Sequence, residues 1–479
     1  MRHAKQKTTA ILLILCIVCG ICLHRSAGLL EAAEEEMQTS AISPLESLVG
    51  GDGQYAAGNQ YGVVYSIDNT VIAQEFVYDG KTKYCAAEGY SSIIGCEGSG
   101  GLIYSLRQTL LSNASEINKT AHRGNSVVTT LHSKGMKTAN NILSAFDEEC
   151  EASITLVIRE GAVLVAAGNN SYSPEAFFHP DDYDDLYIDY SASVNSVGSS
   201  VKPILDRMYL LHNDEYEKDD RIGSKNFVDF SYIRLDDGAV IHNHDHYVPS
   251  CYEGSTEEDP SLFWRHCTLS EALQWSSNVF HILHAERLGF TNAQTYLNEM
   301  TGIQRPIITE INKLDAVTCQ KDRLPWFFFG QDFECSPVRM CHLFNHITGG
   351  IFTQPFYVAQ VIQPDGTLLY EANSTARSEY RIKVKTEDDI LIEAMADTFE
   401  SYVSEAVSKQ YDRRVLAKSG TAQNADGTQD RVMMVSVLSE DRETVLASAC
   451  FAINKTEMDY TNRYMVEQLL MVLHAADIF

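Results

Sequence analysis

The fold is decided by a stretch near the C-terminus that reads Val415-Leu416-Ala417-Lys418-Ser419-Gly420-Thr421-Ala422. Two further apolar, β-branched runs follow it, at residues 432–438 and 444–453. The connections carry turn-forming residues, with Asn424, Asp426 and Gly427 in the first and residues 439–442 in the second. These runs therefore predict three consecutive strands that form one side of a mostly antiparallel sheet.

Two more strands are predicted far away in the sequence. Residues 153–158 and 162–166 are apolar runs separated by Glu160 and Gly161, which is typical of a hairpin. At the other end, Met458, Met465, Leu469 and Val472 recur at helical spacing and predict a C-terminal amphipathic helix. Strands at both ends with helical segments between them indicate an α+β fold. We expect a mostly antiparallel five-stranded sheet covered by helices, with central strands from both termini.

The chain is long enough for more than one domain, and its beginning indicates export. Basic residues near the start precede an apolar run from Thr9 to Leu23, so residues 1–25 are predicted to be a signal anchor. If it is not cleaved, the protein is held in the cell membrane by a single pass, with the rest of the chain extracytoplasmic; if it is cleaved, the protein is secreted. Residues 26–49 are expected to be a linker, residues 50–150 a small N-terminal domain, and residues 151–479 the main domain.

The overall charge excludes one class of partner. The chain carries 37 Lys and Arg against 65 Asp and Glu, a formal net charge of −28. Nucleic-acid binding requires clustered basic residues to contact phosphates, so a nucleic-acid partner is not expected. His242, His244 and His246 alternate as metal ligands on a strand would, but the polar residues around them favour a solvated loop.

The first motif with chemical potential is Ser199-Ser200-Val201-Lys202. Residues three apart share one face of a helical turn, so Ser199 and Lys202 should meet. Pro203 indicates that the regular helix begins close to Lys202, with Ser199 at its positive end. A neutral lysine amine can take the proton of a serine hydroxyl and activate it as a nucleophile. Alone, the pattern is more often that of an exposed serine at a helix start and a solvated lysine.

Two weaker motifs follow it. Ser276-Ser277-Asn278 offers a hydroxyl and an amide on a loop between helices, although we expect Ser270 to cap a helix that runs on to Gly289. Lys418-Ser419-Gly420-Thr421 lies on the predicted strand 415–422 and offers a positive charge and hydroxyl groups to a peptide carboxylate. If that strand is an edge strand, it could pair with a peptide substrate. Taken singly, the first motif is more typical of ordinary turn chemistry and the second of a strand end with an exposed lysine.

Together and in this order, the three motifs resemble those of the penicillin-binding protein and serine β-lactamase superfamily. The flanking residues strengthen the resemblance over roughly residues 150 to 455; they include Gly198 and Pro203, Ala272-Leu273, Gly330-Gln331, Ser336-Pro337, Gly349-Gly350 and Pro355. More weakly, residues 62–73 look like the start of the noncatalytic domain of class B penicillin-binding proteins. The resemblance implies that residues 151–479 are a transpeptidase domain.

The resemblance also implies an activity: a peptidoglycan D,D-transpeptidase that forms an acyl-enzyme with D-Ala-D-Ala stem peptides and is acylated by β-lactams. Ser199 would be the nucleophile, Lys202 its base, and Ser276 with Lys418 the proton donors to the leaving group. Asn278, Ser419, Gly420 and Thr421 would bind the peptide, with the backbone N–H groups of Ser199 and Thr421 as the oxyanion hole. No metal or cofactor is expected.

The chain departs from the family pattern in two places. Val197 stands where the family usually has a proline, and residues 431–434 read Arg-Val-Met-Met where it often has a Trp-Phe pair. Neither departure removes a catalytic group, but both leave substrate preference and turnover open. The alternatives are therefore a D,D-carboxypeptidase or β-lactamase, in which water deacylates the enzyme, and a noncatalytic sensor that binds β-lactams or peptidoglycan.

Overall fold

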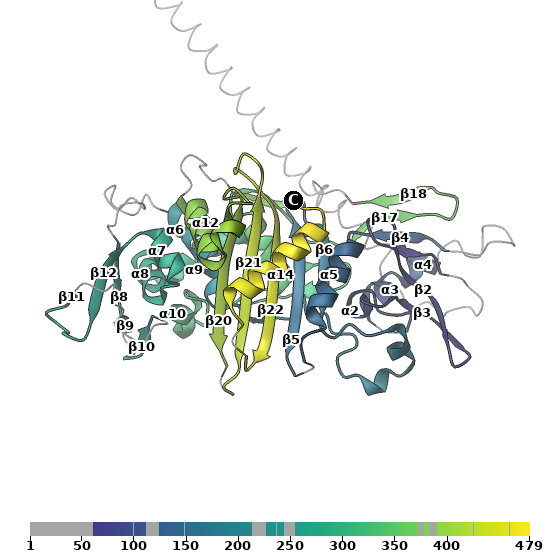
Figure 1. Cartoon of the computed structure of the whole chain (residues 1–479), viewed down its shortest axis with the longest axis horizontal. Coiled ribbons are helices and arrows are strands. Elements are labelled where there is room, and N and C mark those ends of the chain that lie inside the picture. The colour runs from purple at the N-terminus through teal and green to yellow at the C-terminus, as the bar shows by residue number, and fades with distance from the viewer. Residues whose placement is uncertain are drawn as a thin grey trace, which may run out of the picture.

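The computed structural model describes residues 61–479, apart from positions 99, 112–123, 148, 213–226, 236, 244–253, 373–377, 383–389, 425 and 459. A five-stranded sheet occupies the middle of the molecule, with helices on both faces and a second sheet at one end (Figure 1). The predicted signal anchor and linker, residues 1–49, lie outside the described residues. Of the helices that the structure describes, none combines the length and apolarity needed to cross a membrane.

The central sheet has the strand order β20-β21-β22-β5-β6, and all neighbours in it are antiparallel. Its strands are β20 (Val415–Gln423), β21 (Gln429–Leu438), β22 (Val445–Thr456), β5 (Glu151–Ile158) and β6 (Val163–Gly168). The two predicted strand groups join where Phe451 of β22 lies opposite Ile154 of β5. The predicted five-stranded antiparallel sheet of an α+β fold is therefore confirmed, with β20 at its edge.

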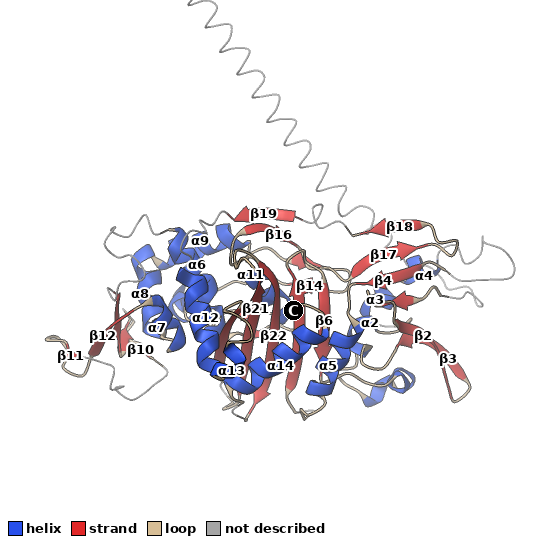
Figure 2. Ribbon diagram, turned by 45° about the horizontal axis from the view of Figure 1, so that its top comes forward, coloured by secondary structure: helices blue, strands red, loops and turns tan. Residues whose placement is uncertain are grey.

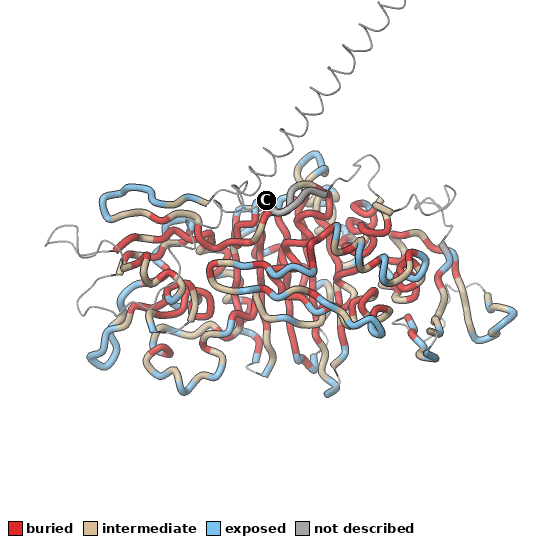
Figure 3. Tube along the Cα trace, turned by 180° about the vertical axis from the view of Figure 1, so that it is seen from behind, coloured by how far each residue is buried: buried red, intermediate tan, exposed pale blue. Residues whose placement is uncertain are grey.

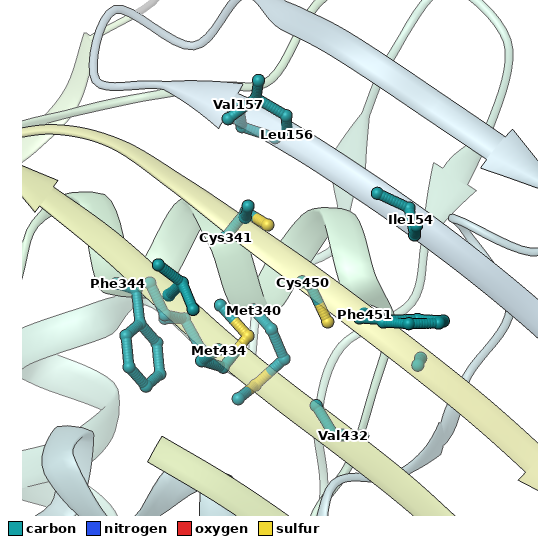
Figure 4. Packing of buried hydrophobic residues seen from close by; sticks show 14 of the residues in the cluster. Ile154, Leu156, Val157, Met340, Cys341, Phe344, Val432, Met434, Cys450 and Phe451 are labelled. Carbon is teal, nitrogen blue, oxygen red and sulfur yellow. The ribbon is translucent and has the colours of Figure 1, made fainter. Parts of the chain in front are cut away.

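Helices bury both faces of this sheet. The helix α11 (Pro337–Asn345) packs against β21, β22 and β5, and Met340, Cys341 and Phe344 point from it towards the strands (Figure 4). On the other face lie α14 (Asn462–Ala475) and α5 (Ser133–Leu143), with α14 crossing in front of β21 and β22 in Figure 1. Strands covered on both faces read as continuous apolar runs, and the strands of this sheet are accordingly among the most buried segments (Figure 3).

The predicted C-terminal helix is present, but it begins after Met458. Thr461 caps α14 by accepting a hydrogen bond from the N–H of Tyr464, so Met458 lies in the preceding connection. Met465, Leu469 and Val472 are buried on the side that faces the sheet, as their spacing predicted.

A layer of helices lies beside the edge strand β20 (Figure 2). It comprises α6 (Lys202–Leu211), α7 (Leu269–Gln274), α8 (Asn278–Leu288), α9 (Phe290–Thr301), α10 (Leu324–Phe327), α12 (Ile390–Tyr402) and α13 (Glu405–Ser408). The prediction of one helix from Ser270 to Gly289 is wrong. Thr268, not Ser270, caps α7 in a reciprocal pair with Glu271, and Ser277 caps α8. Between them Ser276 has φ of 54°, which breaks the helix.

The second sheet joins residues on either side of the expected domain boundary. Its order is β18-β17-β4-β1-β2-β3. Four of its strands, β1 (Val64–Tyr65), β2 (Val71–Tyr78), β3 (Lys81–Ala86) and β4 (Ser126–Thr129), precede residue 150, and β17 (Val358–Ile362) and β18 (Leu368–Glu371) come much later. The short helices α2 (Ser91–Ile94), α3 (Gly101–Ser105) and α4 (Arg107–Leu111) lie near it (Figure 1). The boundary at residue 150 remains a prediction.

The remaining strands of the described residues are short and form small sheets of two or three strands. They pair as β7 (Asn195–Ser196) with β15 (Glu334–Cys335), β9 (Tyr232–Arg234) with β10 (Val240–His242), β13 (Ile307–Ile308) with β14 (Lys313–Leu314), β16 (Gly350–Thr353) with β19 (Ser378–Ile382), and β12 (Phe263–Cys267) with both β8 (Phe227–Phe230) and β11 (Gly254–Ser255).

Candidate active site

Ser199 lies on a 3-10 turn, Gly198–Val201, that leads directly into α6; we call this segment the Ser199 turn. Pro203 fits the first turn of α6 because the first N–H groups of a helix have no partner within it. Ser199 itself is half-buried, whereas Ser200 behind it is buried and donates its hydroxyl to the carbonyl of Val197. The predicted placement of Ser199 just ahead of the helix that begins at Lys202 is confirmed.

Three glycines allow the Ser199 turn to lie close to two other backbone segments. A Cβ atom on Gly420 of β20 would overlap the carbonyl oxygen of Val197 and lie 2.6 Å from the amide nitrogen of Ser200. A Cβ on Gly330 would overlap the carbonyl oxygen of Gly198. Gly198 has φ of 53°, and a Cβ there would lie 2.7 Å from the amide nitrogen of Thr421. The turn is thus held between the edge strand β20 and the loop at Gly330.

Val197 precedes the Ser199 turn and stands where a proline was expected from the resemblance. The backbone N–H of Val197 donates a hydrogen bond of 3.0 Å to the carbonyl of Phe333. This bond continues the pairing of β7 with β15, which ties the approach to Ser199 to the segment after Gly330. A proline has no N–H and could not make this bond. Val197 is therefore used here as a hydrogen-bond donor as well as a buried apolar side chain.

The Lys202 amine is buried and faces the loop between α7 and α8. Its Nζ donates hydrogen bonds of 2.6 Å to the carbonyl of Ser276 and 2.8 Å to Oδ1 of Asn278. Burial lowers the pKa of Lys202 well below the usual lysine value, and the nearby charge of Lys418 lowers it further. Asp206 and Asp229 act in the opposite direction, but desolvation dominates. The site therefore favours a neutral amine, which can accept a proton.

The Ser276 hydroxyl lies between two buried amines. Lys418 Nζ donates to Ser276 Oγ at 3.0 Å, and Lys202 Nζ lies 3.4 Å from the same oxygen. Burial also lowers the pKa of Lys418, with Tyr402 opposing the shift. A positive φ at a serine is an unfavourable backbone conformation that tends to persist only where the surroundings require it, commonly at active sites. The strained Ser276 therefore links Lys202 and Lys418 in one chain of polar groups.

The edge strand β20 presents the remaining predicted residues. Lys418 and Gly420 point into the helical layer, where Lys418 is fully buried. Ser419 and Thr421 alternate with them and are half-buried. The other edge of β20 is paired with β21, where Arg431 lies opposite Thr421. Three of the predicted peptide-binding residues, Ser419, Gly420 and Thr421, are thus on an edge strand next to the Ser199 turn.

One residue at this strand was not predicted. Tyr402, the last residue of α12, places its hydroxyl 2.8 Å from Ser419 Oγ and accepts the backbone N–H of Ser419 at 3.3 Å. Its hydroxyl also stabilises the charged form of Lys418. Tyr402 is sixteen positions before Lys418 in the sequence and belongs to no motif. Only the packing of α12 against β20 brings it to the site.

A buried polar cluster behind the Ser276 loop was also missed. Asn243 Oδ1 accepts the backbone N–H groups of Asn278 at 2.8 Å and Val279 at 3.0 Å. Asp229 accepts the hydroxyl of Ser277 at 2.7 Å and forms a buried ion pair with Arg265 at 2.6 Å. The solvated loop predicted around residues 242–246 is thus wrong at Asn243, which is buried; His244 and His246 lie outside the described residues. The cluster fixes the start of α8.

The structure therefore brings the three sequence motifs to one place. Lys202, Ser276, Asn278 and Lys418 are connected by hydrogen bonds, and Ser419, Gly420 and Thr421 lie on the strand that adjoins the Ser199 turn. Asn278, expected to bind a peptide, is occupied here by Lys202 and by the carbonyl of His242, to which it donates at 3.1 Å. No cluster of His, Cys, Asp and Glu suited to a metal ion occurs among the described residues.

Comparison with known proteins matches residues 234–464 to the penicillin-binding protein transpeptidase domain. This range includes Ser276, Asn278 and Lys418 but begins after the Ser199 turn. Penicillin-binding protein 1A of Streptococcus oralis is 24% identical over 234 residues, which cover 48% of this chain and 31% of that protein. The chain thus matches about a third of the length of this curated relative.

Solved structures extend the likeness over most of the chain. The apo form of penicillin-binding protein 3 from Mycobacterium tuberculosis has a TM-score of 0.67 at 13% identity, covering 88% of this chain and 97% of that one. The same protein complexed with ampicillin has a TM-score of 0.62 at 14% identity, covering 88% and 96%. At these identities the likeness shows a shared fold.

Proposed function

Because the chain belongs to the penicillin-binding protein transpeptidase family, we propose that it is a serine-type peptidoglycan D,D-transpeptidase with Ser199 as nucleophile. The observation that carries this proposal is the convergence of two buried amines, Lys202 and Lys418, on the Ser276 hydroxyl beside the Ser199 turn. Two buried lysines that form no ion pair with a carboxylate among the described residues are costly unless they are uncharged or serve catalysis.

The first step is acylation. Neutral Lys202 takes the proton of the Ser199 hydroxyl while the oxygen attacks the carbonyl between the two D-alanines of a stem peptide. The backbone N–H groups of Ser199 and Thr421 stabilise the negative oxygen of the tetrahedral intermediate. The close approach of Gly198 to the amide of Thr421 supports this pairing of donors.

The second part of acylation is departure of the terminal D-alanine. Its nitrogen needs a proton as the C–N bond breaks, and the Ser276 hydroxyl supplies it. Ser276 is replenished from the amines of Lys202 and Lys418, which lie 3.4 Å and 3.0 Å from its oxygen. The proton taken from Ser199 thus reaches the leaving group, and the acyl-enzyme and free D-alanine are the products.

Substrate binding uses the edge of β20. An extended stem peptide pairs with this strand by β-augmentation, with its carboxylate near Lys418, Ser419 and Thr421. When the peptide binds, Asn278 gives up its hydrogen bond with Lys202 and forms one with the peptide. The amine of a second stem peptide then attacks the acyl-enzyme and forms the cross-link. β-Lactams acylate Ser199 in the same way; ampicillin in the complex of the structural relative supports this expectation.

The partners follow from this activity. They are peptidoglycan stem peptides, β-lactams, and the cell membrane through the predicted anchor at residues 1–25. Residues 151–479 form the transpeptidase domain on the extracytoplasmic side, after a noncatalytic domain at residues 50–150 and the linker at residues 26–49.

The acceptor decides between this proposal and its closest alternatives. We expect the full chain, incubated with a D-Ala-D-Ala stem peptide and an amine-bearing acceptor peptide, to give a cross-linked product by mass spectrometry, with one D-alanine released for each link. D-alanine without a cross-link would indicate a carboxypeptidase. Rapid hydrolysis of penicillin would indicate a β-lactamase. If the protein neither releases D-alanine nor hydrolyses penicillin, it would be a noncatalytic sensor.

A further inference from the structure

A second cross-link joins α6 and α8 one turn behind the site. Asp206 is four residues after Lys202 on α6, and His281 is four residues after Ser277 on α8. His281 Nε2 lies 3.1 Å from Asp206 Oδ1 and 3.2 Å from Oδ2. Both side chains are buried, with relative exposures of 0% and 1%. Lys202 joins the same two helices through its hydrogen bond to Asn278. The Asp206–His281 pair is thus a second contact between α6 and α8, one turn further along both helices.

The hydrogen bonds of His281 require a proton between the two side chains. His281 Nδ1 lies 2.7 Å from the carbonyl oxygen of Ser277, which only accepts hydrogen bonds, so Nδ1 carries a proton. Nε2 faces the oxygens of Asp206, and a bare nitrogen facing a carboxylate would be repelled. A second proton therefore lies between Nε2 and Asp206. The two side chains therefore share one proton, and the pair has no net charge.

This neutrality affects Lys202, which shares a helix face with Asp206. An unneutralised carboxylate beside a buried lysine favours its ammonium form, and Asp206 does act to raise the pKa of Lys202. Among the described residues, other charged or titratable groups near the two side chains include Lys418 on β20, Asp229 on β8, Tyr209 on α6 and His284 on α8. His212 and Tyr296 stack at the far end of α6.

We propose that His281 is a positioning residue of the active site, which cancels the charge of Asp206 and so keeps Lys202 uncharged and able to act as a base. The proposal rests on the assignment of Lys202 as the base. Without His281, the Asp206 carboxylate would be left unneutralised and would favour the ammonium form of Lys202. A purely structural role would slow acylation alike at every pH, whereas this role changes the pH at which Lys202 loses its proton.

The test compares the wild-type full chain with His281→Gln and with Asp206→Asn/His281→Gln. Glutamine retains hydrogen-bonding groups but cannot hold the extra proton. The titration of Lys202, followed by NMR of 13C-labelled lysine and assigned with Lys202→Met, is expected to move about one pH unit higher in His281→Gln. At a pH below this range, acylation by a fluorescent penicillin is expected to fall about tenfold. In the double variant the carboxylate is gone, and both values should return towards the wild type.

The outcomes separate this inference from the proposed function. An unshifted Lys202 in folded His281→Gln, or a shift that persists in the double variant, would overturn it. If the Lys202 titration shifts as expected in the variants but the wild type is not acylated, the proposed function fails and the inference stands. Should either variant fail to fold, 15N NMR of labelled histidine in the wild type decides, because we expect a proton on His281 Nδ1 and a proton between His281 Nε2 and Asp206. An Nδ1 without a proton, or an Nε2 with no proton bonded to it or shared with Asp206, would contradict the proposal.

Discussion

Replacing Lys202 with Met is expected to slow acylation by a fluorescent penicillin by about a thousandfold, since general-base catalysis contributes about 10² to 10⁴ in rate. Methionine is unbranched and close in size to the apolar stem of lysine, but it cannot accept a proton. It also leaves Asn278 Oδ1 and the carbonyl of Ser276 without their shared donor. The measurement is the rate of fluorescent adduct formation, resolved by denaturing electrophoresis.

Two comparisons make this result specific. Lys409→Met removes an exposed lysine, paired with Glu405 on the surface, and should leave the rate unchanged. In the wild type, acylation should fall as the pH is lowered through the depressed pKa of Lys202, because the amine then becomes charged and cannot act as a base. A Lys202→Met protein that is folded and reacts at the wild-type rate would exclude Lys202 as the base.

The second large effect is expected at Gly420, because there is no room for a Cβ atom between this residue and the Ser199 turn. An alanine there would overlap the carbonyl of Val197 and approach the amide nitrogen of Ser200. The turn or β20 must move, which separates the Ser199 turn from the amide of Thr421. A displacement of about 1 Å costs about a hundredfold in rate, so Gly420→Ala should reduce penicillin acylation by at least this factor.

A matched substitution controls for loss of glycine as such. Gly98 has no atom within 4 Å of an added Cβ, so Gly98→Ala should be acylated at the wild-type rate. Thermal unfolding of both variants, followed by circular dichroism, would show that the domain remains folded. Wild-type acylation of Gly420→Ala would mean that the close approach of β20 to the Ser199 turn is not needed for the reaction.

The parts of the fold that the sequence predicted are those that local patterns determine. The strands of the central sheet are long apolar runs with turn residues at their ends, and β20, β21 and β22 lie within a few residues of the predicted ranges. The helix predicted across residues 270–289 was wrong because apolar periodicity continues through Ser276. The interruption depends on a positive φ that Asn243 and Asp229 support from elsewhere in the chain.

The site residues that belong to short sequence motifs could be predicted. Those that reach the site only through long-range packing could not. Lys202, Ser276 and Lys418 belong to short patterns whose order is informative. Tyr402 and His281 belong to none, and they reach the site only because α12 packs on β20 and α8 packs on α6. A single sequence holds no signal for such contacts, since they depend on which helix faces meet after folding.

The central claim, that Ser199 is a nucleophile activated by this arrangement, is tested most directly by mass mapping. The purified full chain would be incubated with a penicillin, digested, and analysed beside the Ser199→Ala variant. We predict one added penicillin per chain, located on the peptide that contains Ser199, and none on the variant. A folded wild-type protein that gains no adduct, or a Ser199→Ala protein that gains the same adduct, would contradict the account.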